Sequence, residues 1–586
     1  MFRREIASLV MGCLLASQGL AGALKEEPVE DFGLLDHQGA FRQLSYHWKD
    51  DQTKAIVLFS HGVGCPLVRK RYQQLHTLAA SYAPKGVSFW LLNANAQDAY
   101  QDLQLEAEDF EVTLPILDDD TQEVARRLGI ERTAEAIVID TETLRMVYRG
   151  PVDDRLGYES EKPEATRHYL VEALEAHLSG KEPNTPEASG PGCQIHFGAW
   201  EKHQQQPIDY RSEIAPLIQE KCVRCHTDGG IAPFAFTSHQ KLEGWSDMMQ
   251  EVLLTQRMPP WQADPHHGTF RDDLSLSAEQ KQRLLHWIAL GAPQGGGEDP
   301  LATSLRPKLD WHLGEPDHIV AIPRQSVPAE GIIDYRYLTM DLPFEEDTWI
   351  TGADVLPGDR QALHHVIAFI LPPEGERRRY RRWLTGYAPG VEASRFPSNT
   401  GVLVRKGERL LLELHYTAYG KAVQDQTQLG LYLADGPIEH RLQTGIFIDH
   451  SIEIPPHHRA FPWSRTEDIR EDIILYSMNP HMHFRGKAMR FELEHPDGRR
   501  ENLVSVPHYN FNWQHTYVLD QPLRVPRGSK LHLHAQWDNS DRNPSNPDPS
   551  RRVGWGEQSF DEMFFGTFQF VRDRGQSLED TSLSLR

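Results

Sequence analysis

The sequence predicts a multidomain protein with an α/β domain first, a small all-α domain second and two all-β sandwich domains last. Three observations indicate this order. Apolar runs alternate with helical stretches in the first part, helical periodicity dominates the second, and face-to-face alternation dominates the third. Two stretches rich in Pro, Gly and acidic residues separate the parts, and we expect them to stay extended or mobile: residues 180–192 and 292–300.

Residues 1–23 are typical of a secretory signal peptide. Two arginines precede a mostly apolar stretch (6–20), and Ala21-Gly22-Ala23 offers small residues for cleavage after Ala23. A lipoprotein signal ending at Cys13 is the alternative, although its apolar core would be unusually short. No later run approaches the ~20 apolar residues that span a bilayer. We therefore expect a periplasmic or secreted protein without stable membrane insertion.

A formal net charge of −23 argues against nucleic acid as a partner, because a phosphate backbone requires a basic footprint. The one basic cluster, "ERRRYRR" (376–382), is either a site for an anionic partner or a solvated loop face. Cysteines are few, and residues 301–586 contain none. We therefore expect no disulfide in the β domains, and their apolar cores must supply the stability of the fold.

The α/β domain is assigned to residues 24–185. "AIVLFS" (55–60) and "VSFWLLNA" (87–94) read as buried strands, while residues 69–83 and 165–180 have helical periodicity. Cys65-Pro66 follows the first of these strands, and "TAEAIVID" and "YRGPVDDR" come later. Over residues 28–180 these features resemble the redoxin branch of the thioredoxin fold.

Cys65 departs from the active sites of that fold. Leu67 and Val68 replace the rest of a C-x-x-C motif, Gly62 stands where peroxiredoxins place a Thr, and Ala134 stands where the fold normally has its cis-proline. Cys193 lies just beyond the domain. The two cysteines are candidates for a redox or copper-handling role, with a structural disulfide or a docking scaffold as the alternatives.

The small all-α domain is assigned to residues 196–297. It opens with a predicted helix, "YRSEIAPLIQEKCVRCH" (210–226), and closes with an amphipathic helix in which Ser277 and Gln280 have capping-box spacing. The first helix ends in a C-x-x-C-H motif: Cys222, Cys225 and His226.

In C-x-x-C-H, two thiols attach to the haem vinyl groups and the His becomes an axial ligand, so the motif predicts a c-type cytochrome with one covalent haem c. A chance match or a zinc site is the alternative. Met258 is the preferred second axial ligand, because Pro259-Pro260 can fix its thioether. Met248 and Met249 are its rivals.

The β domains are assigned to residues 308–436 and 437–575, with the joint near Asp435-Gly436-Pro437. "LLLELHY" and "KLHLHAQW" alternate side chains between faces, as antiparallel sandwiches do. Possible copper ligands follow in order, since imidazole and thioether donors suit copper. They are His364, His365, His415, His481, His483 and Met563.

The spacing of these ligands has geometric consequences. Residues two apart in a strand project to the same face, so His481 and His483 can meet one metal. His364 and His365 are adjacent, and joint ligation requires a bulge or a strand end. His-His pairs also occur at 266 and 457, and His532-Leu533-His534 competes with the pair at 481.

The six candidate copper ligands lie in four segments, which occur in this order: "QALHHVIAFI", "LLLELHYTAYG", "MNPHMHFRGK" and "WGEQSFDEMFFGTFQF". Over residues 310–572 they resemble the copper type II, ascorbate-dependent monooxygenases, which include peptidylglycine α-hydroxylating monooxygenase and dopamine β-monooxygenase. The resemblance implies two jelly-roll-like domains and two copper ions, separated by solvent and sharing no ligands. It makes His481, His483 and Met563 the catalytic, O2-binding site, and His364, His365 and His415 the electron-storing site.

By the same resemblance, the protein hydroxylates a C–H bond of an unknown small-molecule or peptide substrate with O2. Asn479 and Thr567 replace the Arg and Tyr of the peptide hydroxylases, which argues against amidation of glycine-extended peptides. The fused haem domain suggests that electrons from an external reductant or redox protein arrive through the haem.

Two alternatives remain. One is a non-catalytic copper- and haem-binding protein for electron transfer or metal handling. The other, the least favoured, is a thiol-disulfide or peroxide enzyme centred on Cys65.

Overall fold

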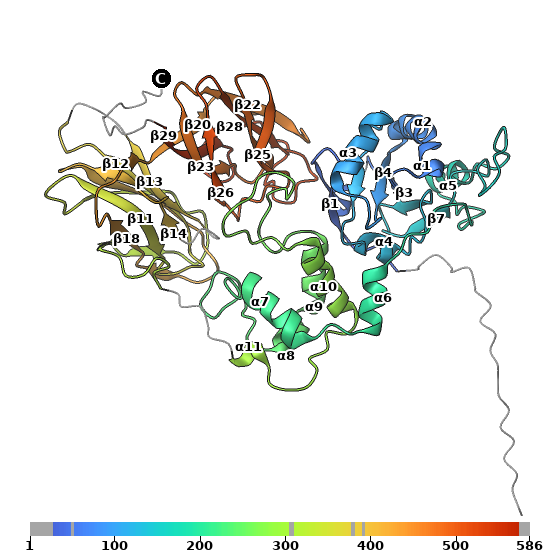
Figure 1. Cartoon of the computed structure of the whole chain (residues 1–586), viewed down its shortest axis with the longest axis horizontal. Coiled ribbons are helices and arrows are strands. Elements are labelled where there is room, and N and C mark those ends of the chain that lie inside the picture. The colour runs from blue at the N-terminus through green and yellow to red at the C-terminus, as the bar shows by residue number, and fades with distance from the viewer. Residues whose placement is uncertain (1–26, 49–51, 304–309, 377–380, 389–392, 574–586) are drawn as a thin grey trace, which may run out of the picture.

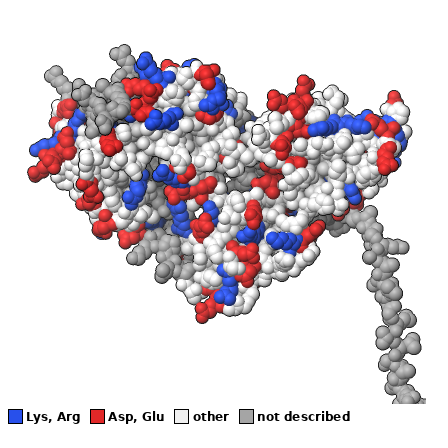
Figure 2. All heavy atoms as spheres, in the orientation of Figure 1, with Lys and Arg blue, Asp and Glu red and all other residues white. Residues whose placement is uncertain are grey.

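The computed structural model (Figure 1) describes residues 27–48, 52–303, 310–376, 381–388 and 393–573. The predicted signal peptide and the centre of the basic cluster (377–380) lie outside the described residues. The helices in the described stretches are too short or too polar to traverse a bilayer. On the face seen in Figure 2, Lys and Arg lie among Asp and Glu and form no continuous basic surface.

The N-terminal domain is built on a mixed sheet with strand order β5-β4-β3-β6-β7, in which β3, β4 and β5 run parallel and β6 and β7 antiparallel. Its strands are β3 (Ala55–His61), β4 (Val87–Asn93), β5 (Ile116–Asp118), β6 (Ala136–Asp140) and β7 (Met146–Gly150), and a hairpin of β1 (Gly33–Leu35) and β2 (Phe41–Gln43) precedes them. The helices are η1 (Leu44–His47), α1 (Pro66–Arg69), α2 (Tyr72–Tyr82), η2 (Ala83–Lys85), α3 (Tyr100–Asp109), α4 (Glu123–Leu128) and α5 (Tyr169–Leu178).

Both faces of this sheet are buried. Along β3, Ala55, Val57 and Phe59 enter one core and Ile56 and Leu58 enter the other. A strand covered on both sides needs apolar residues at every position, which is why it reads as a continuous apolar run. The predicted sheet with flanking helices is confirmed.

The first predicted linker is extended but not free. Residues 186–188 lie along β7: the amide of Arg149 donates to the Pro186 carbonyl (2.9 Å), and the amide of Ala188 donates to the Arg149 carbonyl (3.0 Å). The amide of Thr133 likewise donates to the Cys193 carbonyl (2.9 Å). Because β7 is an edge strand with unpaired backbone groups, the linker gains hydrogen bonds by docking there. Of the two predicted states of this linker, extended or mobile, the structure shows the extended one.

The second part is a small bundle of short helices. They are α6 (Gly198–Gln205), the π-helical turn η3 (Tyr210–Ile214), α7 (Ala215–Lys221), α8 (His239–Gly244), α9 (Ser246–Leu254), α10 (Ala278–Ala289) and α11 (Pro300–Thr303). The predicted helix 210–226 begins at Tyr210, where its first turn is π-helical, but it stops at Lys221 and not at His226. Residues 222–226 instead form a tight turn closed by a hydrogen bond from the His226 amide to the Cys222 carbonyl (2.9 Å).

The third part is a large all-β region, as predicted, made of two successive sandwiches. In the first, a sheet ordered β10-β16-β12-β13 packs on a sheet ordered β19-β15-β11-β18-β8. The strands are β8 (His318–Ala321), β9 (Gln325–Val327), β10 (Arg336–Asp341), β11 (Thr348–Leu356), β12 (Leu363–Leu371), β13 (Arg382–Tyr387), β14 (Ala393–Arg395), β15 (Thr400–Val404), β16 (Arg409–Tyr416), β17 (Val423–Asp425), β18 (Gln428–Leu433) and β19 (His440–Arg441).

In the second sandwich, a sheet ordered β20-β29-β23-β26 packs on a sheet ordered β22-β27-β24-β25. Because β19 still pairs with β15 of the first sandwich, the chain enters the second one at β20. The strands are β20 (Gln443–Asp449), β21 (Glu453–Ile454), β22 (Phe461–Asp468), β23 (Ile473–His481), β24 (Gly486–Glu494), β25 (Arg500–Val506), β26 (Tyr517–Val525), β27 (Lys530–Trp537), β28 (Val553–Gly554) and β29 (Phe564–Arg572).

The helical domain lies between the N-terminal domain and the sandwiches (Figure 1). The segment after α9 reaches the second sandwich and pairs with it at two edge strands. Phe270 bridges Leu519 in β26, and the amide of Asp264 donates to the Ser505 carbonyl in β25 (2.8 Å). The N-terminal domain also touches this sandwich, where Phe41 stacks on His508 (4.1 Å between ring centroids).

Candidate functional site

Three histidines of the first sandwich converge. His364 and His365 open β12, and His415 lies opposite His365 in β16. A β-bulge between Leu363 and His365 turns the two adjacent side chains toward the same space, as their joint ligation would require. One ring nitrogen from each histidine lies within 4.8 Å of the others, which is the geometry of a three-nitrogen metal site.

The electrostatics of this cluster suit a metal. Burial lowers the pKa of His364 to about 3 and of His415 to about 4, so both imidazoles are neutral at pH 7, as ligation requires. Nε2 of His364, Nε2 of His365 and Nδ1 of His415 are buried without a hydrogen-bond partner. Tyr335 stacks on His415 (4.4 Å) and fixes its plane. Buried nitrogens without partners are costly, and a metal ion would satisfy them.

A second pair of histidines lies at the end of β23. The rings of His481 and His483 are 5.2 Å apart and perpendicular. His483 is 1% exposed, and neither of its ring nitrogens has a hydrogen-bond partner. His481 Nδ1 contacts Gln514 Oε1 (2.9 Å), which leaves Nε2 for a metal. The strand ends at His481, so the pair straddles its end and does not lie within it as predicted.

Met563 immediately precedes β29, whose ladder with β23 ends at His481 opposite Phe565. The amides of His483 and Met563 both donate to one carboxylate oxygen of Glu562 (3.1 and 3.4 Å). The backbone of Met563 therefore lies close to that of His483.

The competing His-x-His motif has a structural explanation. In β27, Nδ1 of His532 contacts Thr466 Oγ1 (2.8 Å) and its Nε2 faces Glu494 (3.3 Å). The His532 ring is thus already satisfied by hydrogen bonds, whereas Nε2 of His534 is buried without a hydrogen-bond partner. The two histidines therefore do not offer a pair of free nitrogens, as a shared metal site would need.

The two departures from the peptide hydroxylases fall at one place. Asn479 and Thr567 face each other across β23 and β29. The amide group of Asn479 donates to the His515 carbonyl (2.9 Å) and so supports a neighbouring loop. Neither position offers a cation for a substrate carboxylate.

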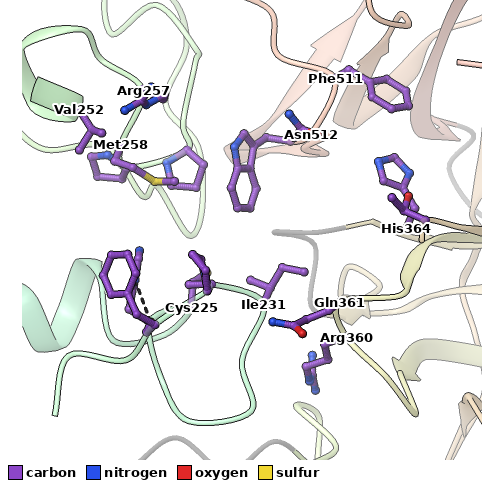
Figure 3. Close-up of a pocket in the computed structure, with 18 of the residues that line it drawn as sticks. Cys225, Ile231, Val252, Arg257, Met258, Arg360, Gln361, His364, Phe511 and Asn512 are labelled. Atoms are coloured by element: carbon purple, nitrogen blue, oxygen red, sulfur yellow. Dashed lines mark hydrogen bonds between the residues drawn. The ribbon is translucent and has the colours of Figure 1, made fainter. Parts of the chain in front are cut away.

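The C-x-x-C-H turn and a methionine line one cavity of about 890 Å³. Cys225 and Met258 face each other across it in Figure 3. Nδ1 of His226 contacts the Phe234 carbonyl (3.1 Å), which leaves Nε2 available as an axial ligand. The lining is largely apolar, as a porphyrin face requires. Met248 and Met249 also line the cavity, but Met249 belongs to the helical core.

The zinc alternative lacks a full set of ligands in this turn. Among the described residues, only the three histidines of the first sandwich form a close set of three or more His, Cys, Asp or Glu ligands.

The far wall of the same cavity belongs to the β domains. His364, His415, Phe511, Asn512 and Trp513 line it, and Figure 3 places His364 and Phe511 at the opposite end from Met258. Sequence reasoning missed Phe511, Trp513 and Gln514. None is a metal ligand by type, and an aromatic-rich loop was the only signal available.

The N-terminal domain holds a pair of thiols. Sγ of Cys65 lies 3.5 Å from Sγ of Cys193, and Thr133 Oγ1 lies 3.3 Å from the former and accepts from the Cys193 amide (3.0 Å). Partial burial and the neighbouring Cys65 raise the pKa of Cys193. At Ala134 φ is +60°, which no proline can adopt, so the active-site geometry differs from that of ordinary thioredoxins.

Residues 26–148 match the sequence profile of the AhpC/TSA family. A search of the curated proteins returns no match. Solved structures with similarity include a hypothetical protein from Sinorhizobium meliloti 1021 (26% identity, 31% of this chain and 97% of that one, TM-score 0.27). An uncharacterized conserved protein from Geobacillus kaustophilus (30%, 29% and 90%, TM-score 0.25) and peroxidoxin BcpB from Mycobacterium tuberculosis (21%, 27% and 98%, TM-score 0.21) are also similar. The N-terminal domain is a thioredoxin-like redoxin domain.

Proposed function

We propose that the protein is an exported copper-dependent monooxygenase that hydroxylates a C–H bond with O2 and receives electrons through a covalently attached haem c. One observation carries the proposal: a single cavity has the C-x-x-C-H turn on one wall and two of the three clustered histidines on the other. Bound haem and copper would supply one-electron transfer and O2 activation.

Each group of side chains has a task in this proposal. His364, His365 and His415 would hold one copper next to the haem, while His481, His483 and Met563 would hold the other. Gln514 keeps the Nε2 face of His481 turned to the metal. Asn479 and Thr567 leave no cation for a carboxylate, so we propose a substrate other than a glycine-extended peptide.

Copper content and O2 consumption test the proposal. The purified protein should bind two copper ions and one haem per chain and consume O2 with a reductant when candidate substrates are added. His481→Ala and Met563→Ala should abolish this uptake. His532→Ala, in the competing His-x-His motif, should not lower the copper content. Full haem and copper loading without O2 uptake would favour the non-catalytic electron-transfer or metal-handling protein.

We also propose a thiol-disulfide role for the redoxin domain, favoured by the 3.5 Å separation of Cys65 and Cys193. Their oxidation to a disulfide would pass two electrons and two protons to a partner disulfide, which becomes two thiols. Incubation with oxidised or reduced glutathione, followed by alkylation of the denatured protein, should reveal one reversible bridge. Cys193→Ser should remove it. A bridge that glutathione cannot reduce would be structural instead.

A further inference from the structure

One aromatic ring of the second sandwich touches both candidate copper sites. Phe511 stacks on His364 with 4.8 Å between centroids and an interplanar angle of 15°. The same ring meets His483 at 5.6 Å and 89°. Phe511 is 8% exposed, so little water reaches it. The ring of Phe511 therefore contacts one candidate ligand of each site.

The loop that carries Phe511 (507–516) is held in place on both sides of the ring. The Tyr509 hydroxyl accepts from the Met482 amide (3.0 Å) and donates to its carbonyl (2.7 Å), directly between His481 and His483. Gln514 contacts His481 through Oε1 and donates to the Phe511 carbonyl through Nε2 (3.1 Å). The phenyl ring is therefore fixed relative to the ligands of the second site.

The loop also reaches the helical domain. His515 Nε2 hydrogen-bonds the carbonyl of Pro260, two residues after the candidate haem ligand Met258. Trp513 and Asn512 line the cavity into which that methionine projects (Figure 3). The haem cavity and both histidine sites thus border the same ten-residue segment.

We infer that Phe511 is the contact through which an electron held at the His364, His365 and His415 site reaches the His481, His483 and Met563 site. This inference rests on the proposed function. In the step, the first copper loses one electron and the second gains it, and no proton need move between the two sites. A ring in contact with a candidate ligand of each site leaves no solvent gap along this path, so it is the favoured path.

The test uses the full chain loaded with haem and copper. Flash photoreduction of the haem under anaerobic conditions supplies one electron, and freeze-quenched samples are followed by electron paramagnetic resonance of the two Cu(II) centres. In the wild type, the signal of the three-histidine site should fall first, and the electron should then equilibrate with the second site. Phe511→Leu should slow this second transfer about tenfold, because leucine leaves a gap in the packed path.

Two further variants make the result specific. Phe511→Tyr keeps the ring and should restore the wild-type rate, while Phe461→Leu, in the same sandwich but outside both sites, should leave it unchanged. An unaltered second transfer in a fully loaded Phe511→Leu protein would overturn the relay and leave the proposed function standing. Copper loss in that variant would make Phe511 a structural support and also overturn the relay. A wild type without copper at both sites would overturn both proposals.

Discussion

At the scale of single residues, the most unusual feature is the number of buried imidazole nitrogens without partners. Four of the five candidate ligand histidines contribute such atoms: His364, His365, His415 and His483. Each buried polar atom left unsatisfied costs about 1–3 kcal/mol. A metal ion bound at the two clusters would satisfy these atoms.

Copper should therefore stabilise the folded protein. A ligand that binds only the native state at about 100 times its Kd adds about 2.7 kcal/mol. We expect the unfolding temperature of the copper-free protein to rise on addition of copper, and His365→Ala to remove part of that rise. Differential scanning calorimetry measures both. An equal rise in His365→Ala would mean that the metal binds elsewhere.

The Gln514 side chain should set the copper affinity of the second site. Since it contacts Nδ1 of His481, Gln514→Ala frees the ring to rotate and should weaken copper binding there about 10–100-fold. Titration of the reduced protein with Cu(I) against a chelator measures the affinity. Gln569→Ala, whose side chain only accepts from Ser477, is the matched control. Equal affinities in the two variants would exclude the positioning role.

The adjacent positions of His364 and His365 led to the prediction of a bulge, and the register shift before His365 is observed. The clustering of these two histidines with His415 is also observed. The sequence could not predict Phe511 or Gln514. Their roles arise from contacts between segments far apart in the chain, and neither residue type is a metal ligand. The thiol pair was only partly predictable. The sequence identified Cys65 and Cys193 as candidates, but the distance between them depends on how the linker docks onto the domain.

At the scale of elements, local signals were reliable at helix starts and poor at helix ends. The capping box at α10 is present, with the Ser277 hydroxyl accepting from the Gln280 amide (3.2 Å) and Gln280 Oε1 accepting from the Ser277 amide (3.0 Å). Periodicity extended the first helix through Cys222 to His226, where the chain turns instead. Helical periodicity does not register the tight turn that presents the C-x-x-C-H side chains to the cavity.

Loss of the cap should destabilise the helical domain. Ser277→Ala removes the acceptor for the Gln280 amide and should lower the free energy of unfolding by about 1 kcal/mol. Urea unfolding followed by tryptophan fluorescence is suitable, because Trp287 in α10 is fully buried. Ser275→Ala, which caps no helix, should change little. Equal losses in both variants would argue against a capping effect.

At the scale of the whole molecule, a buried hydrogen bond joins the redoxin and helical domains. Nε2 of His286 in α10 lies 3.0 Å from a Glu123 oxygen in α4, and both side chains are at most 1% exposed. Burial would raise the pKa of Glu123, but hydrogen bonds from Arg126 and His286 outweigh it and lower the pKa to about 2. Arg126 lies in α4 with Glu123, and His286 is the partner that the helical domain contributes.

Acid should loosen this contact. Because the pKa of Glu123 is depressed from its usual 4.5, its stabilisation is present above pH 4.5 and is lost as the pH falls toward about 2. Small-angle X-ray scattering should show the two domains separating across that window. Glu123→Gln should weaken docking already at pH 7, whereas the exposed Glu142→Gln should not. Identical scattering profiles for both variants would contradict this assignment.

The segment after α9 closes an open edge on each sheet of the second sandwich, since it bonds to β25 at Ser505 and to β26 from Val518 to Asp520. In a fragment beginning at residue 308, the backbone hydrogen-bonding groups of both edge strands would be unpaired. Unpaired edge strands bind strands from other molecules. Expression trials limited to residues 308–575 should accordingly give insoluble material. Replacing the helices with a foreign domain would fail for the same reason, unless the replacement preserves residues 264–271.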